Sequence, residues 1–231
     1  MNYVIWNNKD SREIEGLVIS ELPPITKPQI RVKETVVDGM DGSIIEELGY
    51  ESYDKSIAIG LKVGADFDEI IEYFTGSGEI VFSNEPNKYY RASIIKNIDF
   101  ARLLRFRVAV VAFRVQPFKY DRVEQEIVAN VDEGSVVVEN LGNHTSKPII
   151  TIAGSGIVEL SVNGVATCRY EFPEETDTVT LDSEKQDAYF GSVLKNRQMM
   201  GDFPVFEKGS NVLSWSGTVE SVHIKRYSRW L

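Results

Sequence analysis

The segment Asn140–Gly156 constrains the fold of this chain more than any other stretch. Four residues that the interior of a helix disfavours punctuate it: Gly142, Pro148, Gly154 and Gly156. Between these positions, the run at 149–152 is rich in β-branched residues, which favour an extended backbone. The segment therefore predicts a turn, one short strand and a second turn. It holds no side chains that together indicate a reaction.

Length and composition predict a folded protein of one large or two ordinary domains. The chain has 231 residues, of which 42% are hydrophobic, enough for a real core. Its net charge of −10 argues against nucleic-acid binding, which needs a basic face, and favours solubility as the role of the acidic residues. Cys168 is the only cysteine, so we expect a fold that does not depend on a disulfide.

We expect neither membrane insertion nor secretion. The longest apolar run, Val108–Phe113, is far shorter than the roughly 20 residues that cross a bilayer as a helix. Met1–Asp10 has no basic region followed by an apolar stretch, so it does not predict a signal peptide.

The first part of the chain predicts an α+β domain with one clear helix, over residues 1–120. Alternating or β-branched runs predict strands at 3–6, 16–20, 57–63, 79–83, 89–95 and 100–115, and a half-buried strand at 29–37. The prolines at 23, 24 and 28 predict a loop over Leu22–Pro28, and Asp38–Gly42 predicts a tight turn. Residues 110–113 break the alternation, which indicates a strand end buried on both sides.

The helix is expected from Asp66 to Gly76. Asp66 is a favourable N-cap, and Glu69 three residues later completes a capping-box pattern. Four apolar residues lie at helical spacing on one face, Phe67, Ile70, Ile71 and Phe74, and Gly76 is a natural stop.

The second part predicts a β-sandwich over residues 134–231, preceded by a polar linker at 121–133. Short strands are expected at 136–139, 158–162, 165 onward, 178–181, 211–215 and 219–227. Asn163-Gly164 is a strong hairpin pattern, since both residues tolerate positive φ. Ser183–Met200 predicts loop and short strands, because Gly191 interrupts its helix formers.

The sequence lacks the residues that known catalytic, metal-binding and cofactor-binding motifs require, so we predict no catalytic, metal-binding or cofactor-binding residue. The glycines at 76–78 and 154–156 lack the third glycine of a dinucleotide-binding loop. The two histidines, His144 and His223, and the lone Cys168 supply no zinc set and no placed dyad. Asp38 and Asp41 flank Met40, where a calcium loop would need an oxygen ligand.

The order of features along the chain resembles the distal tail protein family of long, flexible-tailed bacteriophages and prophages. Each matching element is turn or strand chemistry, and together they span nearly the full length: Gly39–Gly42, Ile57–Val63, the Asp66–Gly76 helix, a strand over Arg105–Phe118, Asn140–Gly156, Val162–Val165, Leu181-Asp182, Asn196, Gly201–Pro204, Gly209–Asn211 and Arg229-Trp230. Met40 stands where the family often has a polar residue.

The resemblance implies a structural protein of the virion, made in the cytoplasm of the bacterial host. The first domain would form a ring, hexameric in relatives, that joins the tail tube protein to the tail-tip and receptor-binding proteins. The second domain would be a galectin-like sandwich, and no reaction would be catalysed. The loop Leu22–Pro28 is a candidate arm for the ring. Two alternatives stay open: a module that binds host cell-wall carbohydrate, and an enzyme such as a cell-wall hydrolase.

Overall fold

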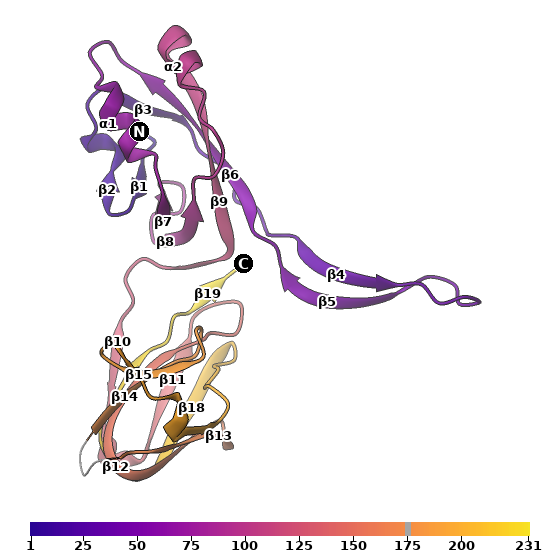
Figure 1. Ribbon diagram of the computed structural model, residues 1–231, viewed down its shortest axis with the longest axis vertical. Coiled ribbons are helices and arrows are strands. Elements are labelled where there is room, and N and C mark those ends of the chain that lie inside the picture. Colours follow the sequence, from indigo (N-terminus) through magenta and orange to yellow (C-terminus); the bar gives the residue numbers. More distant parts are fainter. Residues whose placement is uncertain (174–176) are drawn as a thin grey trace. The chain divides into compact units, whose positions relative to one another are not determined.

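The computed structural model describes residues 1–173 and 177–231, with the backbone alone at residues 100–102. The chain divides into two compact units, one of residues 1–122 with Leu231 and one of residues 123–230. Each unit has its own hydrophobic core. The fold is mainly β, with two short helices in the first unit, as the sequence predicts for the fold class (Figure 1).

The first unit is built on an antiparallel sheet in the order β2-β1-β7-β8-β9-β6-β3. The bounds of these strands agree with most of the predicted ones: β1 (Val4–Trp6), β2 (Lys9–Asp10), β3 (Leu17–Glu21), β6 (Tyr53–Leu61), β7 (Ser77–Phe82), β8 (Lys88–Ser93) and β9 (Val108–Asp121). β6 and β9 pair over eight positions, from Tyr53 opposite Val115 to Gly60 opposite Val108.

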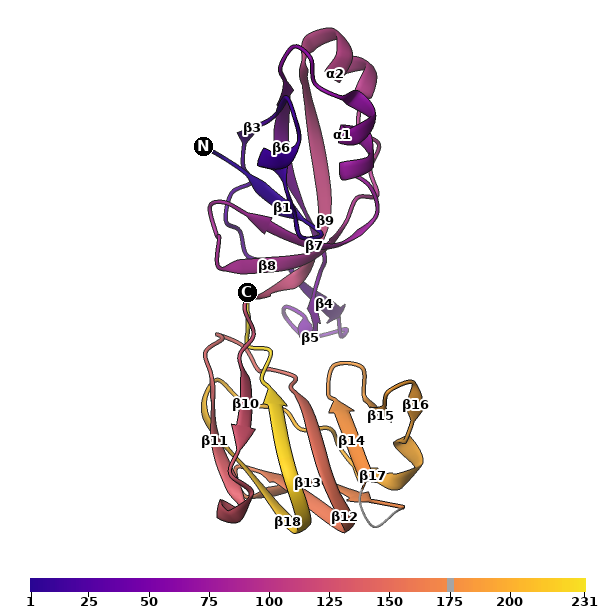
Figure 2. The same cartoon turned by 90° about the vertical axis from the view of Figure 1, so that its left-hand side faces the viewer.

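Helix α1 (Phe67–Tyr73) forms where the sequence predicts it and packs on the sheet (Figure 2). The Asp66 side chain accepts hydrogen bonds from the backbone N–H groups of Asp68 and Glu69, which caps the helix. Glu69 pairs with Lys9 at 2.8 Å. Three residues of the helix end, Ile70, Tyr73 and Phe74, enter the core, and Phe74 meets Phe113 edge-on.

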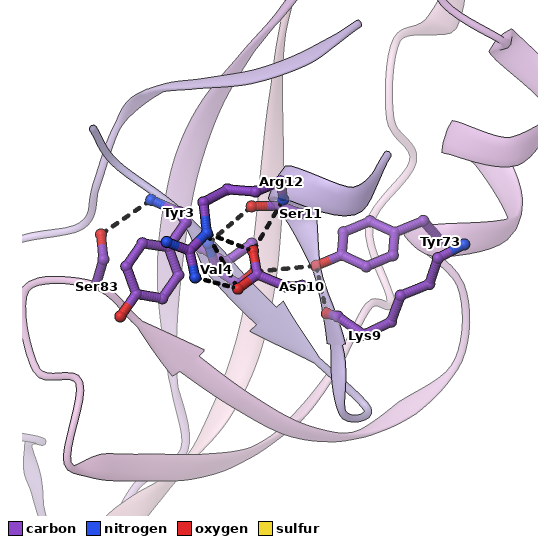
Figure 3. Close-up of polar contacts among 8 residues, drawn as sticks. All are labelled: Tyr3, Val4, Lys9, Asp10, Ser11, Arg12, Tyr73 and Ser83. Carbon is purple, nitrogen blue, oxygen red and sulfur yellow. Dashed lines mark hydrogen bonds and ion pairs between the residues drawn. The ribbon is translucent and has the colours of Figure 1, made fainter. Parts of the chain in front are cut away.

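Side-chain hydrogen bonds fix the first strands to the rest of the unit (Figure 3). The Tyr73 hydroxyl donates to the carbonyl oxygens of Val4 and Lys9, at 3.2 and 3.1 Å. The Val4 N–H donates to Ser11 Oγ at 3.0 Å, in the short 3-10 helix η1 (Ser11–Glu13). These bonds give partners to backbone N–H and carbonyl groups of β1 and β2 that the short strand pairing does not hydrogen-bond.

The predicted strand over 100–115 is wrong in its first half. Residues Phe100–Phe106 form helix α2, Arg107 follows with φ of 59°, and β9 begins at Val108. The alternation of Leu104 and Phe106 with arginines is typical of a strand, but both apolar side chains are exposed and the buried one is Leu103. β9 also continues past Pro117. Proline has no backbone N–H to donate, and Pro117 is tolerated because it lies where the pairing of β9 with β8 shifts register.

The hairpin of β4 (Ile30–Thr35) and β5 (Ile44–Tyr50) is a separate two-stranded sheet that projects from the rest of the first unit (Figure 1). The prediction of a half-buried strand at 29–37 is therefore wrong. The strand forms, but every residue from 31 to 42 is exposed. Alternation defines two faces, and here the residues that the structure describes cover neither of them.

The second unit is a curled antiparallel sheet that folds into two layers. Two long strands, β12 (Ile149–Val162) and β18 (Gly209–Lys225), pass through both layers. Because they run antiparallel, the first half of β12 pairs with the second half of β18 in one layer, and the second half of β12 pairs with the first half of β18 in the other. One layer contains β18 and β12 with β10 (Glu126–Ala129), β14 (Asp177–Asp182), β15 (Asp187–Phe190) and β16 (Val193–Leu194). The other layer contains β18 and β12 with β11 (Ser135–Asn140), β13 (Val165–Glu171) and β17 (Met199–Gly201). The remaining elements are η3 (Asn196–Gln198) and β19 (Arg229–Trp230).

The prediction of a turn at 154–156 is corrected by the corner of this sheet. β12 passes through Gly154 and Gly156 and bends there, with register shifts against β18. A Cβ on Gly154 would lie 2.4 Å from the Thr218 carbonyl oxygen, and one on Gly217 would lie 2.1 Å from that of Ile157. These glycines are needed because two strands cross closely at the corner.

Other features of the second unit agree with the sequence. Asn163 and Gly164 have φ of 53° and 78° and join Val162 to Val165, so the predicted hairpin is confirmed. Residues 183–200 form short strands and loops, also as predicted.

The predicted linker at 121–133 instead contains a strand. β10 (Glu126–Ala129) pairs with the end of β18, and a 3-10 helix, η2 (Val131–Glu133), follows it. Three of its four residues are apolar, but only Ala129 is buried, and polar residues on both sides hide this short edge strand in the sequence.

The turn at 140–144 has a structural explanation. Asn140 is buried, and its amide donates to the carbonyl oxygens of His144 and Glu207, at 2.9 and 3.2 Å. Its side-chain oxygen accepts from the Gly142 N–H at 3.0 Å. The segment that most constrained the fold therefore holds two distant loops of the second unit together.

Candidate assembly surface

The β4–β5 hairpin, which we call the arm, is the most exposed apolar element of the first unit. Seven of its apolar side chains are at least 43% exposed: Val32, Val36, Val37, Met40, Ile44, Ile45 and Leu48. Exposed apolar residues that cluster on one element mark interaction surfaces more often than isolated ones do. The arm is therefore a candidate site for binding another protein chain.

The two faces of the arm differ in chemistry. Paired residues point to the same side, so Val32 with Glu47 and Glu34 with Ile45 form one face. This face carries two acids and two β-branched residues. The other face holds Lys33 and Glu46, whose charged groups lie 3.5 Å apart.

The base of the arm is fastened to the first unit by side chains that donate to backbone carbonyl groups. Lys55 Nζ donates to the Pro24 oxygen at 2.9 Å, and Asn84 Nδ2 donates to the Pro23 oxygen at 2.9 Å. The Tyr53 hydroxyl reaches the Thr26 oxygen at 3.3 Å. The predicted arm, Leu22–Pro28, is thus a fastened loop, and the neighbouring hairpin is the part that projects.

Lys55 is a buried cation, with 2% of its surface exposed. Its ammonium lies 5.0 Å from the ring centroid of Tyr90 and 5.6 Å from that of Tyr53, within cation–π range. Burial lowers the pKa of Lys55, while the charge of Glu85 opposes that shift. The cation is therefore held by rings, one carbonyl group and a nearby carboxylate.

Glu85 is the anion of this cluster. Its carboxylate accepts hydrogen bonds from Lys119 and, at 2.6 Å, from the Tyr90 hydroxyl. Burial raises the pKa of Glu85, but the bonds from Lys119 and Tyr90 outweigh burial, so the net shift is downward. Burial and the carboxylate together raise the pKa of Tyr90.

A second group of exposed apolar side chains stands at the junction of α2 and β9. We define the α2–β9 patch as Leu104, Phe106, Val108 and Val110, which are between 45% and 62% exposed. Arg105 and Arg107 are exposed between them in the sequence. Opposite Val110 and Val108 on β6 stand Ala58 and Gly60, so the neighbouring strand adds no bulk there.

The cysteine and histidines considered as catalytic or metal-binding candidates do not form a common site. Cys168 is buried, and burial raises its pKa to about 12, which suits a packing role and not a nucleophile. His223 Nδ1 lies 3.4 Å from a Glu126 carboxylate oxygen, and His144 lies against Thr145. Within residues 1–173 and 177–231, no group of three or more His, Cys, Asp or Glu side chains could hold a metal ion.

The hollow at the base of the arm is polar. It has a volume of about 400 Å3 and is lined by Arg31, Tyr50, Glu51, Ser52, Arg114 and Gln116.

No helix among the described residues is long and apolar enough to cross a membrane.

Sequence reasoning missed both exposed apolar regions, the arm and the α2–β9 patch. The arm was predicted as part of a domain face, and the patch was predicted as a continuous strand. A usable sign was present in each case: apolar residues stand on both faces of residues 32–48, and Arg105 and Arg107 break the apolar run before β9.

Fold and surfaces together define a mainly β protein of two compact units, with an exposed apolar arm on the first unit. No protein-family model matches the chain, and no curated protein matches its sequence. Among solved structures, the chain is similar to the crystal structure of the Dit protein (gp 19.1) of phage SPP1, described as a paradigm of the hub adsorption apparatus in phages that infect Gram-positive bacteria. The identity is 12%, the match covers 100% of both chains, and the TM-score is 0.74. The chain has the fold of that hub protein, as the resemblance implied.

Proposed function

We propose that this chain is a structural bacteriophage tail protein that assembles into a ring and serves as a hub between the tail tube and the tail-tip apparatus. The observation that carries the proposal is the arm, which exposes seven apolar side chains on an element that projects from the first unit. Such a surface favours coverage by another chain. The full-length likeness in fold to a phage hub protein supports the same role.

The ring is proposed to be a hexamer of the first unit, as in the family that the chain resembles. A projecting arm and a receiving surface elsewhere form a heterologous contact, which closes into a ring when the rotation between subunits permits. The partners would be the tail tube protein and the tail-tip or receptor-binding proteins, and the protein would reside in the virion after synthesis in the host cytoplasm. We propose no catalytic role.

Shortening the arm tests this function. Residues 34–45 are replaced by Asn-Gly, which joins the paired Lys33 and Glu46 through a two-residue turn. We expect the parent to form a closed oligomer in native mass spectrometry and the shortened variant to remain monomeric with an unchanged melting temperature. The matched control replaces the exposed pair Val137 and Val212 by serine. Equal assembly of parent and shortened variant would contradict the proposal.

Binding of cell-wall carbohydrate by the second unit is the alternative function, and one observation favours it. The ring of Phe190 is 51% exposed, beside the exposed Val193 on the next strand. An exposed ring can stack on a sugar. A glycan array with the full chain tests this: binding lost in Phe190→Ala supports the alternative, and no binding by the parent contradicts it.

A further inference from the structure

The arm and the α2–β9 patch lie at opposite ends of one strand ladder. β5 leads into the start of β6, where Tyr53 pairs with Val115. The patch lies at the other end, where Gly60 pairs with Val108. Figure 1 shows the arm pointing away from α2. A contact between arm and patch therefore joins two copies of the chain.

The two surfaces are complementary in charge and in apolar character. One face of the arm presents two β-branched residues, Val32 and Ile45, with the carboxylates of Glu34 and Glu47. The patch offers four exposed apolar side chains, Val108 and Val110 on one face of β9 and Leu104 and Phe106 on different sides of α2. The exposed Arg105 and Arg107 stand next to them in the sequence. Guanidinium groups bind carboxylates through paired hydrogen bonds, so the two sets match in kind and in number.

The patch is also accessible to a flat partner. Ala58 and Gly60 stand beside Val110 and Val108, and neither carries a side chain that would hold a partner strand away. A two-stranded hairpin is flat on each face, so its apolar residues can reach the two valines.

We propose that the arm face formed by Val32, Glu34, Ile45 and Glu47 binds the α2–β9 patch of a second copy of this chain. This inference rests on the proposed ring function and names the surface that receives the arm. Repeated from copy to copy, the contact is head-to-tail, and each chain uses both surfaces once.

Charge reversal tests this contact in the full-length protein. The arm variant carries Glu34→Lys and Glu47→Lys, and the patch variant carries Arg105→Glu and Arg107→Glu. All four positions are exposed, so each variant should keep the parent melting temperature. The control variant carries Glu159→Lys and Glu171→Lys, which makes the same change of charge as the arm variant on exposed positions of the second unit.

Association is measured by sedimentation velocity and native mass spectrometry. We expect the arm variant and the patch variant each to associate about tenfold more weakly than the parent, because like charges then face each other. Their equimolar mixture should regain parent-like assembly with the two variants alternating, and the control should match the parent. If the parent assembles and both reversed variants assemble equally well, the patch assignment is overturned and the ring stands. If the parent stays monomeric at every concentration, both proposals fail.

Discussion

Lys55 donates a hydrogen bond of 2.9 Å to the carbonyl oxygen of Pro24 and so ties a buried ammonium group to the segment that leads into the arm. The ammonium is far from solvent, and burial without partners would cost several kcal/mol. The surrounding rings and Glu85 offset that cost. The base of the arm is thereby fixed before any second chain binds.

Lys55→Met should loosen the base of the arm while leaving the core packed. Methionine fills similar volume but cannot donate to Pro24, so the 22–29 segment loses one of its fastenings. We expect the 15N order parameters of Ile25 and Thr26 to fall from about 0.85 toward 0.6. Lys62→Met, at an exposed lysine near the end of the same strand, should leave them unchanged. Rigid Ile25 and Thr26 in Lys55→Met would show that the bond does not fix the segment.

Acid should destabilise the first unit through Glu85. The folded state lowers the pKa of this carboxyl below its ordinary value of 4.5, so its stabilising contribution is present above that pH and is lost as the pH falls through the folded pKa. Asp10 shifts in the same direction. Urea unfolding between pH 3 and 7 should show a smaller loss of stability for Glu85→Gln than for the parent, with exposed Glu79→Gln as the control. Parallel curves for all three proteins would rule out this linkage.

The corner of the second unit should tolerate no side chain at Gly217. A Cβ there meets the Ile157 carbonyl oxygen at 2.1 Å, and the residue has φ of 98°. Gly217→Ala should therefore lower the free energy of unfolding by about 2 kcal/mol or more. Gly156→Ala is the matched control, because φ is also positive but the space is open, and it should cost about 1 kcal/mol. Equal costs, measured by urea denaturation, would mean that the corner relaxes.

The two units are predicted to fold separately. Trypsin should cut first after Arg122, at the boundary between the units, and leave two resistant fragments. Mass spectrometry of the early digest identifies the cut. Early cleavage throughout 140–231, before any cut near Arg122, would contradict this prediction.

Local chemistry made α1 and the Asn163-Gly164 hairpin predictable. Asp66 and the apolar spacing that follows it act within one helical turn, and the hairpin needs only two adjacent residues of positive φ. In contrast, α2 was predicted as a strand because alternation at 104–107 is a strand pattern. In the structure Leu104 and Phe106 are exposed, and the helix buries Leu103 in the core of the unit instead.

The exposure of the arm and of the α2–β9 patch could not be predicted from sequence for a related reason. A pattern of alternating residues shows that a strand has two faces, but it does not show what covers them. At Val32 and Ile45 none of the described residues does, so apolar residues that resemble core residues are exposed. The role of Lys55 was also hidden, since its partners at Pro24 and Tyr90 are remote in sequence.

The native mass of the full-length protein tests the central claim most directly. Native mass spectrometry at increasing concentration should show one closed species at about six times the 26.1 kDa of the chain, with few intermediates, because the last contact closes the ring. An open series of growing oligomers would contradict ring closure. A monomer at every concentration, with the arm intact and folded, would contradict the proposed function itself.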